Sequence, residues 1–239
     1  MSWTTDRARM RLIVLGVATA ALTAAAILGS FLVAPEDSDQ GLKQRIFYFH
    51  VPIALVSLLA FGVACVAGIL GLRAREHHRR VGWDDVQVAS VTIGMVFSVL
   101  TIITGSIWAK ASWGTWWVWD DPRLVTYLVL VLLYAAYFVL RSSAEGDRQM
   151  RYGAVYAIFA FAAVPLSFWS VRVAKSAVHP VVITRNGAAM PHSMLWWFLV
   201  SLAAMTGVFA TVLQLQLIQR RAERTMSDLK MRLERLVSA

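Results

Sequence analysis

Long apolar stretches separated by polar segments dominate the hydrophobic pattern of this chain. Each stretch is close to the ~20 residues that a helix needs to cross ~30 Å of hydrocarbon. Because backbone polar groups find no water inside a bilayer, such stretches form helices rather than strands. The pattern predicts an all-α integral membrane protein with six spans: Leu12 to Val33, Ile46 to Leu72, Val86 to Ala109, Leu124 to Leu140, Tyr152 to Val171 and Met194 to Ile218.

The first apolar stretch follows three arginines, as the apolar region of a secretory signal peptide does. It is longer than the roughly 7–15 apolar residues of a signal peptide, and further spans follow it, so we expect a retained signal anchor.

The distribution of basic residues predicts the orientation of the six spans. Sixteen of the 23 Lys and Arg residues lie in the N-terminal segment, in the connections 73–85 and 141–151, and after residue 218. The other seven lie in the connections 35–45, 110–123 and 172–193. Since cytoplasmic segments carry the excess of Lys and Arg, both termini are predicted in the cytoplasm of a bacterium, with the second set of connections on the periplasmic face of its inner membrane.

The chain is predicted to divide into a six-span unit over residues 1–218 and a cytoplasmic tail over residues 219–239. In the tail, apolar residues recur at alternating spacings of three and four, at Met226, Leu229, Leu233 and Leu236. This spacing predicts a short amphipathic helix, which would pack on a partner helix or lie on the inner leaflet of the membrane.

Composition excludes several classes of protein. The chain is 58% hydrophobic and 15% charged, and its net charge of +9 comes from residues that flank apolar runs, so no nucleic-acid partner is expected. The single cysteine, Cys65, allows no intramolecular disulfide and no cysteine-based metal site. The chain has neither a Cys-x-x-Cys-His haem-attachment motif nor a Gly-x-x-x-x-Gly-Lys-Ser/Thr nucleotide motif.

The predicted outer connection 110–122 contains four of the ten tryptophans within seven positions, in Trp113-Gly-Thr-Trp-Trp-Val-Trp-Asp120. One interpretation is an aromatic belt at the level of the lipid headgroups. The other is a flat apolar platform for a planar ligand. In a helix, Trp113, Trp116 and Trp117 would share one face, whereas Trp119 and Asp120 would point elsewhere. In this interpretation Gly114 lets the ligand approach closely.

Three of the five histidines, His50, His179 and His192, are predicted on the same side as the tryptophans. The other two lie in a basic cytoplasmic turn and are expected to be solvated. Each outer histidine has an ordinary explanation on its own: a buried carbonyl or hydroxyl partner for His50, and surface exposure for the other two. Together with the tryptophans, however, two imidazoles would provide both axial ligands of a haem iron, and indole faces would stack on the porphyrin.

Haem propionates would need cationic partners on the same side of the membrane. Arg45 precedes His50, and Arg123 follows the tryptophans, so these two are the candidates. Other outer cations compete with them, and lipid phosphates are an alternative partner for every one: Lys110, Arg172, Lys175 and Arg185.

At these residues the chain resembles a known family. Trp113 to Asp120 is similar to the tryptophan-rich motif of the haem-handling proteins of cytochrome c maturation. Arg45-Ile-Phe-Tyr-Phe-His50-Val-Pro52 resembles the corresponding segment of the cytochrome c maturation protein C family, also called the haem exporter protein C family. The similarity extends over nearly the whole chain, although Asp121 and Pro122 make the link between Asp120 and Arg123 one residue longer than is usual.

The resemblance implies that haem b is held non-covalently at the periplasmic face by two histidines. His50 matches the first, and His179 matches the second, with His192 as the alternative. The platform would be formed by Trp113, Gly114, Trp116, Trp117, Trp119 and Asp120. The chain itself would not be an enzyme: it would deliver haem to a periplasmic haem chaperone, maturation protein E, within an ABC-type complex that contains maturation proteins A, B and D.

Three alternatives remain open at this point. A haem-ligating cytochrome c synthase of the other maturation system belongs to the same superfamily, but such proteins are usually longer than 239 residues. A non-haem permease subunit would use the tryptophans only as anchors, yet the predicted span interiors hold only hydroxyls, glycines and Gln87. An electron-transfer cytochrome b would need histidines in the middle of facing spans, where none is predicted.

Overall fold

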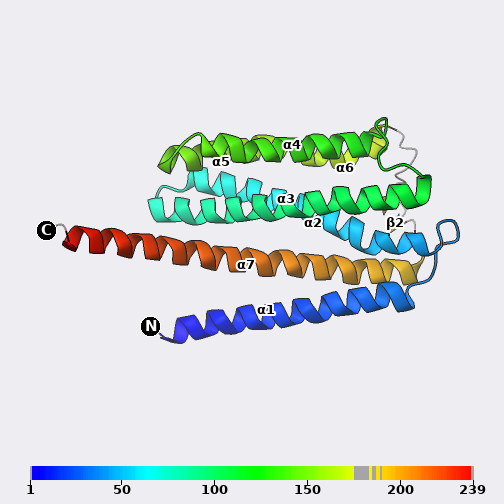
Figure 1. Cartoon of the computed structure of the whole chain (residues 1–239), viewed down its shortest axis with the longest axis horizontal. Helices are drawn as coiled ribbons and strands as arrows, with labels where there is room; N and C mark the ends of the chain where they lie inside the picture. Colours follow the sequence, from blue (N-terminus) through cyan, green and yellow to red (C-terminus); the bar gives the residue numbers. More distant parts are fainter. Residues whose placement is uncertain (1, 175–182, 185–186, 189, 238–239) are drawn as a thin grey trace.

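Helices make up almost all of the structure, a computed structural model that describes residues 2–174, 183–184, 187–188 and 190–237. In chain order the elements are α1 (Ser2–Leu28), η1 (Gly29–Val33), η2 (Leu42–Ile46), α2 (Phe47–Arg73), α3 (His77–Trp113), α4 (Pro122–Ser142), α5 (Gly146–Ala160), α6 (Ala163–Val173), β1 (Ile183–Thr184), β2 (Gly187–Ala188) and α7 (His192–Val237) (Figure 1). The two short strands pair in antiparallel fashion.

Within the described residues, six segments are long and apolar enough to cross a membrane, as the sequence predicts: Asp6–Val33, Leu42–Arg73, His77–Trp113, Pro122–Ser142, Gly146–Ser170 and His192–Val237. They confirm the all-α fold with six spans. The start of α1 and the end of α7 lie at the same end of the bundle (Figure 1). The sequence also predicts both termini on one side of the membrane.

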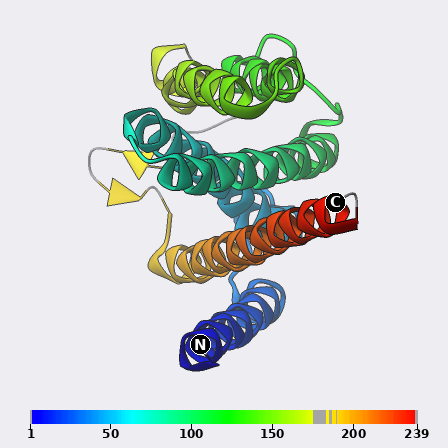
Figure 2. The same cartoon turned by 90° about the vertical axis from the view of Figure 1, so that its left-hand side faces the viewer.

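The helices are stacked in successive layers (Figure 2). The first layer contains α4, α5 and α6, the second contains α2 and α3, and α7 then separates α2 and α3 from α1. Small residues let α1 and α7 approach closely: a methyl group on Gly207 would lie 2.8 Å from the Thr19 hydroxyl, and Gly29 lies against the Trp197 ring. Small side chains at such positions are typical of helix pairs in membranes.

Aromatic packing holds the second layer on the first. The Phe61 ring of α2 stacks on the Tyr134 ring of α4 with 3.6 Å between their centroids, and both side chains are fully buried. Gly94 of α3 makes room for this stack, because a methyl group there would lie 2.7 Å from a Phe61 ring carbon. The helices that carry the two pockets described below are therefore fixed relative to one another by a well-packed core.

The fifth predicted span is not one continuous helix. Residues 161 and 162 form a turn between α5 and α6, with hydrogen bonds from the Ala162 amide to the Phe159 carbonyl and from the Val164 amide to the Phe161 carbonyl. Pro165 explains the break, because its ring has no N–H and would clash with the carbonyl four residues earlier, that of Phe161. The predicted span from Tyr152 to Val171 therefore consists of two helices, α5 and α6, which the apolar pattern does not separate.

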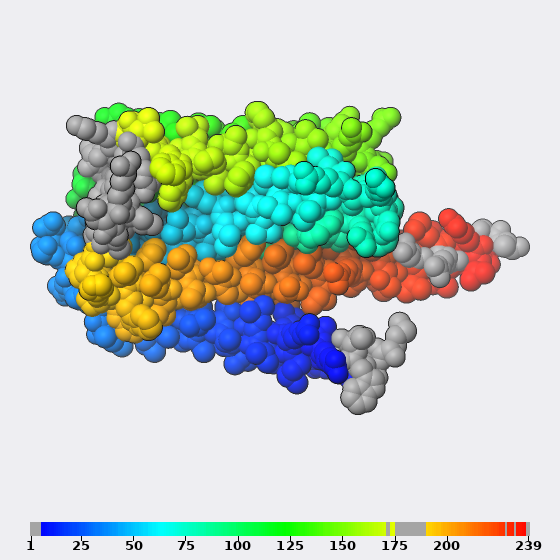
Figure 3. All heavy atoms as spheres, turned by 180° about the vertical axis from the view of Figure 1, so that it is seen from behind, coloured from blue at the N-terminus to red at the C-terminus, as the bar shows by residue number. Residues whose placement is uncertain are grey.

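The predicted C-terminal helix is the continuation of α7, which does not break between residues 218 and 219. This end of α7 extends beyond the other helices (Figure 3). Arg224 forms an ion pair with Asp85 of α3, a carboxylate that is only 3% exposed. Beyond this ion pair, the four predicted apolar residues of the tail are exposed.

Candidate functional site

A cavity lies between α2, α3, α4 and α6, at the end of the bundle opposite the start of α1 and the end of α7. It contains about 940 Å³ of empty space, counting its open side. Its walls are mainly apolar and aromatic. They include five of the residues that the sequence singles out: His50, Trp113, Trp116, Trp117 and Arg123.

His50 lies in the first turn of α2 and lines the cavity, with its imidazole directed toward α3. Its Nδ1 is 3.0 Å from the hydroxyl oxygen of Thr104. That hydroxyl donates its only hydrogen to backbone carbonyls of α3, the nearest being that of Leu100 at 2.8 Å. It therefore accepts the hydrogen bond from His50, which places the imidazole proton on Nδ1 and the lone pair on Nε2.

Two neighbours on α3 set the orientation of the His50 ring. A methyl group on Gly105 would lie 2.8 Å from His50 Cε1, so the ring fits against this helix only because residue 105 is glycine. The Trp108 ring meets the imidazole edge to face, with 5.7 Å between the ring centroids. The Trp108 Nε1–H donates a hydrogen bond to the Gln40 side chain at 2.8 Å, which fixes the indole in turn.

The tryptophans do not share one helical face. The helix α3 ends at Trp113, and residues 114–121, here called the tryptophan loop, are not helical. Gly114 terminates the helix with a φ of 76°, a conformation that side chains disfavour, and its amide bonds the Lys110 carbonyl at 3.1 Å. A methyl group there would meet no atom within 4 Å, so the turn, rather than a close approach, requires the glycine.

The tryptophan loop divides into residues that line the cavity and residues that point outward. Trp116 and Trp117 line the cavity, and the Trp117 Nε1 is buried with no acceptor among the described residues. A ligand oxygen in the cavity would give this donor a partner. Trp119 is 73% exposed and Asp120 is also exposed, and neither lines the cavity, although Trp119 packs on Trp117 at 5.9 Å.

Arg123 brings a positive charge to the cavity from the start of α4. One guanidinium nitrogen donates to the Phe168 carbonyl of α6 at 3.2 Å. The additional residues between Asp120 and Arg123 start this helix: the Asp121 carboxylate accepts from the amides of Arg123 and Leu124, each at 3.1 Å, and Pro122 occupies the first turn. The longer link therefore builds an N-cap and still leaves Arg123 at the cavity.

The other predicted site residues lie elsewhere or outside the described part of the chain. Arg45 belongs to η2 and does not line the cavity; its buried Nε has no acceptor among the described residues. His192 begins α7, where it is exposed, and it does not line the cavity. His179 lies outside the described residues.

Sequence reasoning missed four residues that shape the cavity: Thr104, Gly105, Trp108 and Tyr127. A signal for the first three was present, since residues 101, 104, 105 and 108 recur at helical spacing on α3. The sequence does not show that this face meets His50 across the bundle.

The cavity is suited to a planar apolar ligand that carries both a metal and a carboxylate. Among the described residues, no three His, Cys, Asp or Glu side chains gather to hold a bare metal ion. The cavity instead offers one oriented imidazole, several indole faces, an indole N–H and a guanidinium group. This set fits haem, whose iron binds imidazole, whose ring stacks on aromatic faces and whose propionates accept hydrogen bonds.

Comparison with known proteins gives one consistent result. The family model described as "Heme exporter protein C" matches residues 2–232. A protein of that name from Paracoccus denitrificans is 31% identical over 85% of this chain and 82% of its own length. The protein of that name from Bradyrhizobium diazoefficiens is 33% identical over 83% of this chain and 74% of its own. A putative cytochrome c biosynthesis ccmC-like mitochondrial protein of Marchantia polymorpha is 30% identical over 79% of both.

Proposed function

The chain belongs to the haem exporter protein C family, and we propose that it binds haem in the cavity beside His50 and presents it for transfer during cytochrome c biogenesis. It is a multi-pass membrane protein with a role in haem export, as a transport subunit rather than an enzyme. The finer proposals concern the ligands, the side of the membrane and the partners.

The observation that carries the proposal is the hydrogen bond between His50 Nδ1 and Thr104. Histidines that bind metals commonly donate their other ring N–H to an oxygen, which fixes the tautomer and increases the basicity of the binding nitrogen. Thr104 acts in this way here, and His50 Nε2 is then the atom that binds the iron. Gly105 and Trp108 keep the imidazole plane in one orientation as the iron arrives.

The tryptophan loop and Arg123 would orient the porphyrin around that bond. Trp116 and Trp117 line the cavity and supply apolar faces. The Trp117 Nε1–H, which has no acceptor among the described residues, would donate to one propionate, and the Arg123 guanidinium would hold a propionate through a charge-assisted hydrogen bond. Arg45 would act only on a propionate that extends beyond the cavity.

The second axial ligand would be His179, or His192 in its place, since both follow the fifth span on the same side as His50. With both termini in the cytoplasm, the cavity would lie at the periplasmic face of the inner membrane. Bound haem b would be held non-covalently and passed to the periplasmic chaperone, protein E, within a complex with proteins A, B and D. Transfer requires loss of at least one axial bond, which ATP hydrolysis in the partner complex would drive by moving the outer connections.

Optical spectra of the detergent-purified protein, coexpressed with its haem chaperone, test the proposal. We expect a low-spin spectrum in the wild type. His50→Ala should lose it, because no other described imidazole reaches the cavity. His179→Ala should lose or alter it, and His192→Ala should retain it; the reverse result would make His192 the second ligand.

His78→Ala is the matched control, because His78 is exposed at the opposite end of the bundle and pairs with Glu76. A wild type purified without haem under these conditions, or a His50→Ala variant with an unchanged spectrum, would refute the proposed site. The tryptophans would then serve as an aromatic belt.

A further inference from the structure

A second pocket lies at the other end of the bundle, where α2 ends and α3 and α5 begin. Its empty volume is about 1220 Å³, counting its open side. Apolar residues of α2 and α5, four of them Ala or Gly, form one wall, and polar and charged residues of α3 and α5 form the rest. None of its lining residues belongs to the cavity beside His50.

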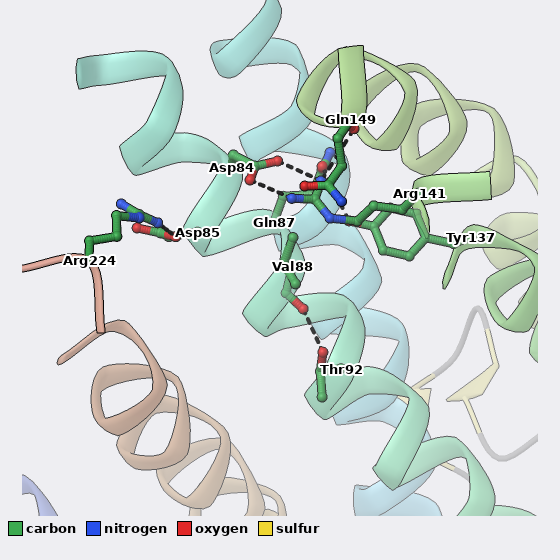
Figure 4. Close-up of polar contacts among 9 residues, drawn as sticks. All are labelled: Asp84, Asp85, Gln87, Val88, Thr92, Tyr137, Arg141, Gln149 and Arg224. Carbon is green, nitrogen blue, oxygen red and sulfur yellow. Dashed lines mark hydrogen bonds and ion pairs between the residues drawn. The ribbon is translucent and has the colours of Figure 1, made fainter. Parts of the chain in front are cut away.

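The deepest polar group in this pocket is the Gln87 amide, which is only 1% exposed. Its Oε1 accepts a hydrogen bond from the Tyr137 hydroxyl at 3.4 Å (Figure 4). Its Nε2 has no acceptor among the described residues. Gly68 of α2 allows this nitrogen to pack closely against it, because a methyl group there would lie 2.5 Å from the nitrogen. A buried donor that lacks an acceptor, on a residue that lines a pocket, is expected to bond an acceptor oxygen from outside the chain.

The charged groups around Gln87 leave an excess of positive charge. The Asp84 carboxylate is neutralised by Arg141, which bonds both its oxygens at 2.8 Å and 2.6 Å (Figure 4). Asp147 pairs with Arg80 at 3.2 Å. Neither Arg148 nor Arg151 has an ion-pair partner within the described part of the chain, and both line the pocket.

The apolar wall leads outward to the surface of the bundle that faces the hydrocarbon. Leu72 and Val155 line the pocket and remain 44% and 54% exposed. A ligand whose head occupies the charged part would therefore lay an apolar chain against these side chains. This arrangement fits an amphiphile with an oxygen-rich anionic head rather than a free soluble ion.

We propose that this pocket binds the phosphate head group of an anionic phospholipid. Gln87 Nε2 donates to one head-group oxygen, Arg148 and Arg151 neutralise the phosphate at the mouth, and the acyl chains extend past Leu72 and Val155. Basic pockets between membrane helices bind anionic head groups in this way. In the proposed orientation the lipid belongs to the inner leaflet, but its binding does not depend on haem.

Native mass spectrometry of the delipidated full-length protein in detergent tests this proposal. The probes are phosphatidylglycerol, phosphatidylcholine and inorganic phosphate, each added separately. We expect the wild type to retain phosphatidylglycerol and to show a higher thermal unfolding midpoint with it. Phosphatidylcholine and inorganic phosphate should give neither result. Equal retention of phosphatidylcholine, with an equal rise in the unfolding midpoint, would overturn the proposal in favour of non-specific lipid binding. An equal effect of inorganic phosphate would overturn it in favour of a site for free anions.

Two variants separate the roles of the donor and the charges. Gln87→Leu removes the buried donor, and the double change Arg148→Gln with Arg151→Gln removes the cations at the mouth. Each should weaken phosphatidylglycerol binding at least tenfold. The matched control is Arg7→Gln with Arg9→Gln, which removes two exposed arginines at the same end of the bundle from outside the pocket.

The Arg148 and Arg151 double variant changes only exposed side chains, so it still tests the proposal if the buried Gln87→Leu variant misfolds. A loss of binding in the Arg7 and Arg9 control equal to that in the Arg148 and Arg151 variant would overturn the proposal, because general surface charge would then explain the binding. Displacement of phosphatidylglycerol from the wild type by haem would also overturn the proposal, because the two ligands are expected to bind at separate sites. The haem spectrum provides the independent measurement: lipid-site variants should keep it, so failure of one site is distinguishable from failure of the other.

Discussion

The cavity beside His50 and the pocket beside Gln87 lie at opposite ends of the same pair of helices, α2 and α3. In the cavity, aromatic rings form much of the wall, and hydrogen bonds orient the polar groups, as Thr104 orients His50. In the pocket, guanidinium groups and a buried amide donor surround a wall of small residues. In the two proposals, a single helix pair thus carries an iron ligand at one end and donors to an anionic head group at the other.

The difference follows from what each ligand requires. An iron–imidazole bond is directional, so its ligand must be held in one orientation by the groups behind it. Attraction to a phosphate is less directional, so exposed arginines at a pocket mouth suffice once a buried donor fixes the position of the head group. If this distinction is correct, changes at one end should leave the function of the other end intact.

The largest expected effect concerns stability rather than binding. Asp84→Asn removes one charge of a pair in which both side chains are nearly buried, at 12% and 13% exposure, and leaves Arg141 without its counter-charge. We expect the free energy of unfolding to fall by about 3 kcal/mol. Denaturation in mixed micelles, followed by tryptophan fluorescence, measures this change. Asp147→Asn, in an exposed pair, is the control and should cost less than about 1 kcal/mol.

The same Asp84 variant tests whether the two ends are independent. Its haem spectrum, normalised to folded protein, should match that of the wild type. An altered spectrum at an equal folded fraction would show that the two ends are coupled.

The next largest effect is expected at Gly105, where a methyl group would press on the His50 ring. Gly105→Ala should weaken haem binding by about 2 kcal/mol, or roughly 30-fold, because the ring must leave its orientation or the helices must separate. Haem titration followed by absorbance gives the affinity. Gly82→Ala lies on the same helix with no atom within 4 Å of the added methyl group and should leave the affinity unchanged.

A smaller effect is expected at Thr104. Thr104→Val keeps the shape of the side chain but removes the acceptor for His50 Nδ1, so haem affinity should fall about tenfold, with a shift in reduction potential. Thr92→Val is the control, because the Thr92 hydroxyl bonds the Val88 carbonyl of its own helix and no other partner in the described part of the chain. Equal spectra and potentials for Thr104→Val and Thr92→Val would remove the proposed role of the hydroxyl.

The smallest expected effects distinguish residues within the tryptophan loop. Trp117→Phe keeps an aromatic face but removes the buried N–H, and should weaken haem binding about threefold through loss of one hydrogen bond. Trp119→Phe, at a mostly exposed position, should change the affinity less than twofold. A larger loss for Trp119 than for Trp117 would reverse the division of the loop into cavity-lining and outward residues.

The spans were predictable because hydrocarbon imposes one length and one type of secondary structure on any segment that crosses it. Pro165 indicates a break in the fifth span. The apolar residues continue across this break, however, so the hydrophobic pattern alone predicts a single span. The helical interpretation of the tryptophans failed at Gly114, where a residue able to adopt positive φ ended the helix.

The site was only partly predictable because its geometry depends on contacts between helices. His50 and the tryptophans are readable as residue types with haem chemistry. Thr104, by contrast, looks like any intrahelical hydroxyl until α2 and α3 are packed and its oxygen meets Nδ1 of His50. Likewise, Gln87 was visible in the sequence as a polar residue within a span, but only the packed structure shows that it lines a pocket and that its Nε2 has no acceptor among the described residues.

The unbroken length of α7 has a mechanical consequence. Its 46 residues correspond to a rod of about 69 Å, more than twice the ~30 Å thickness of the hydrocarbon core. One end of the rod starts at His192, and the other projects past the bundle (Figure 3). Because a continuous helix resists axial compression, a push or twist applied to residues 219–237 is transmitted along its length to the opposite face of the membrane, without any molecule crossing.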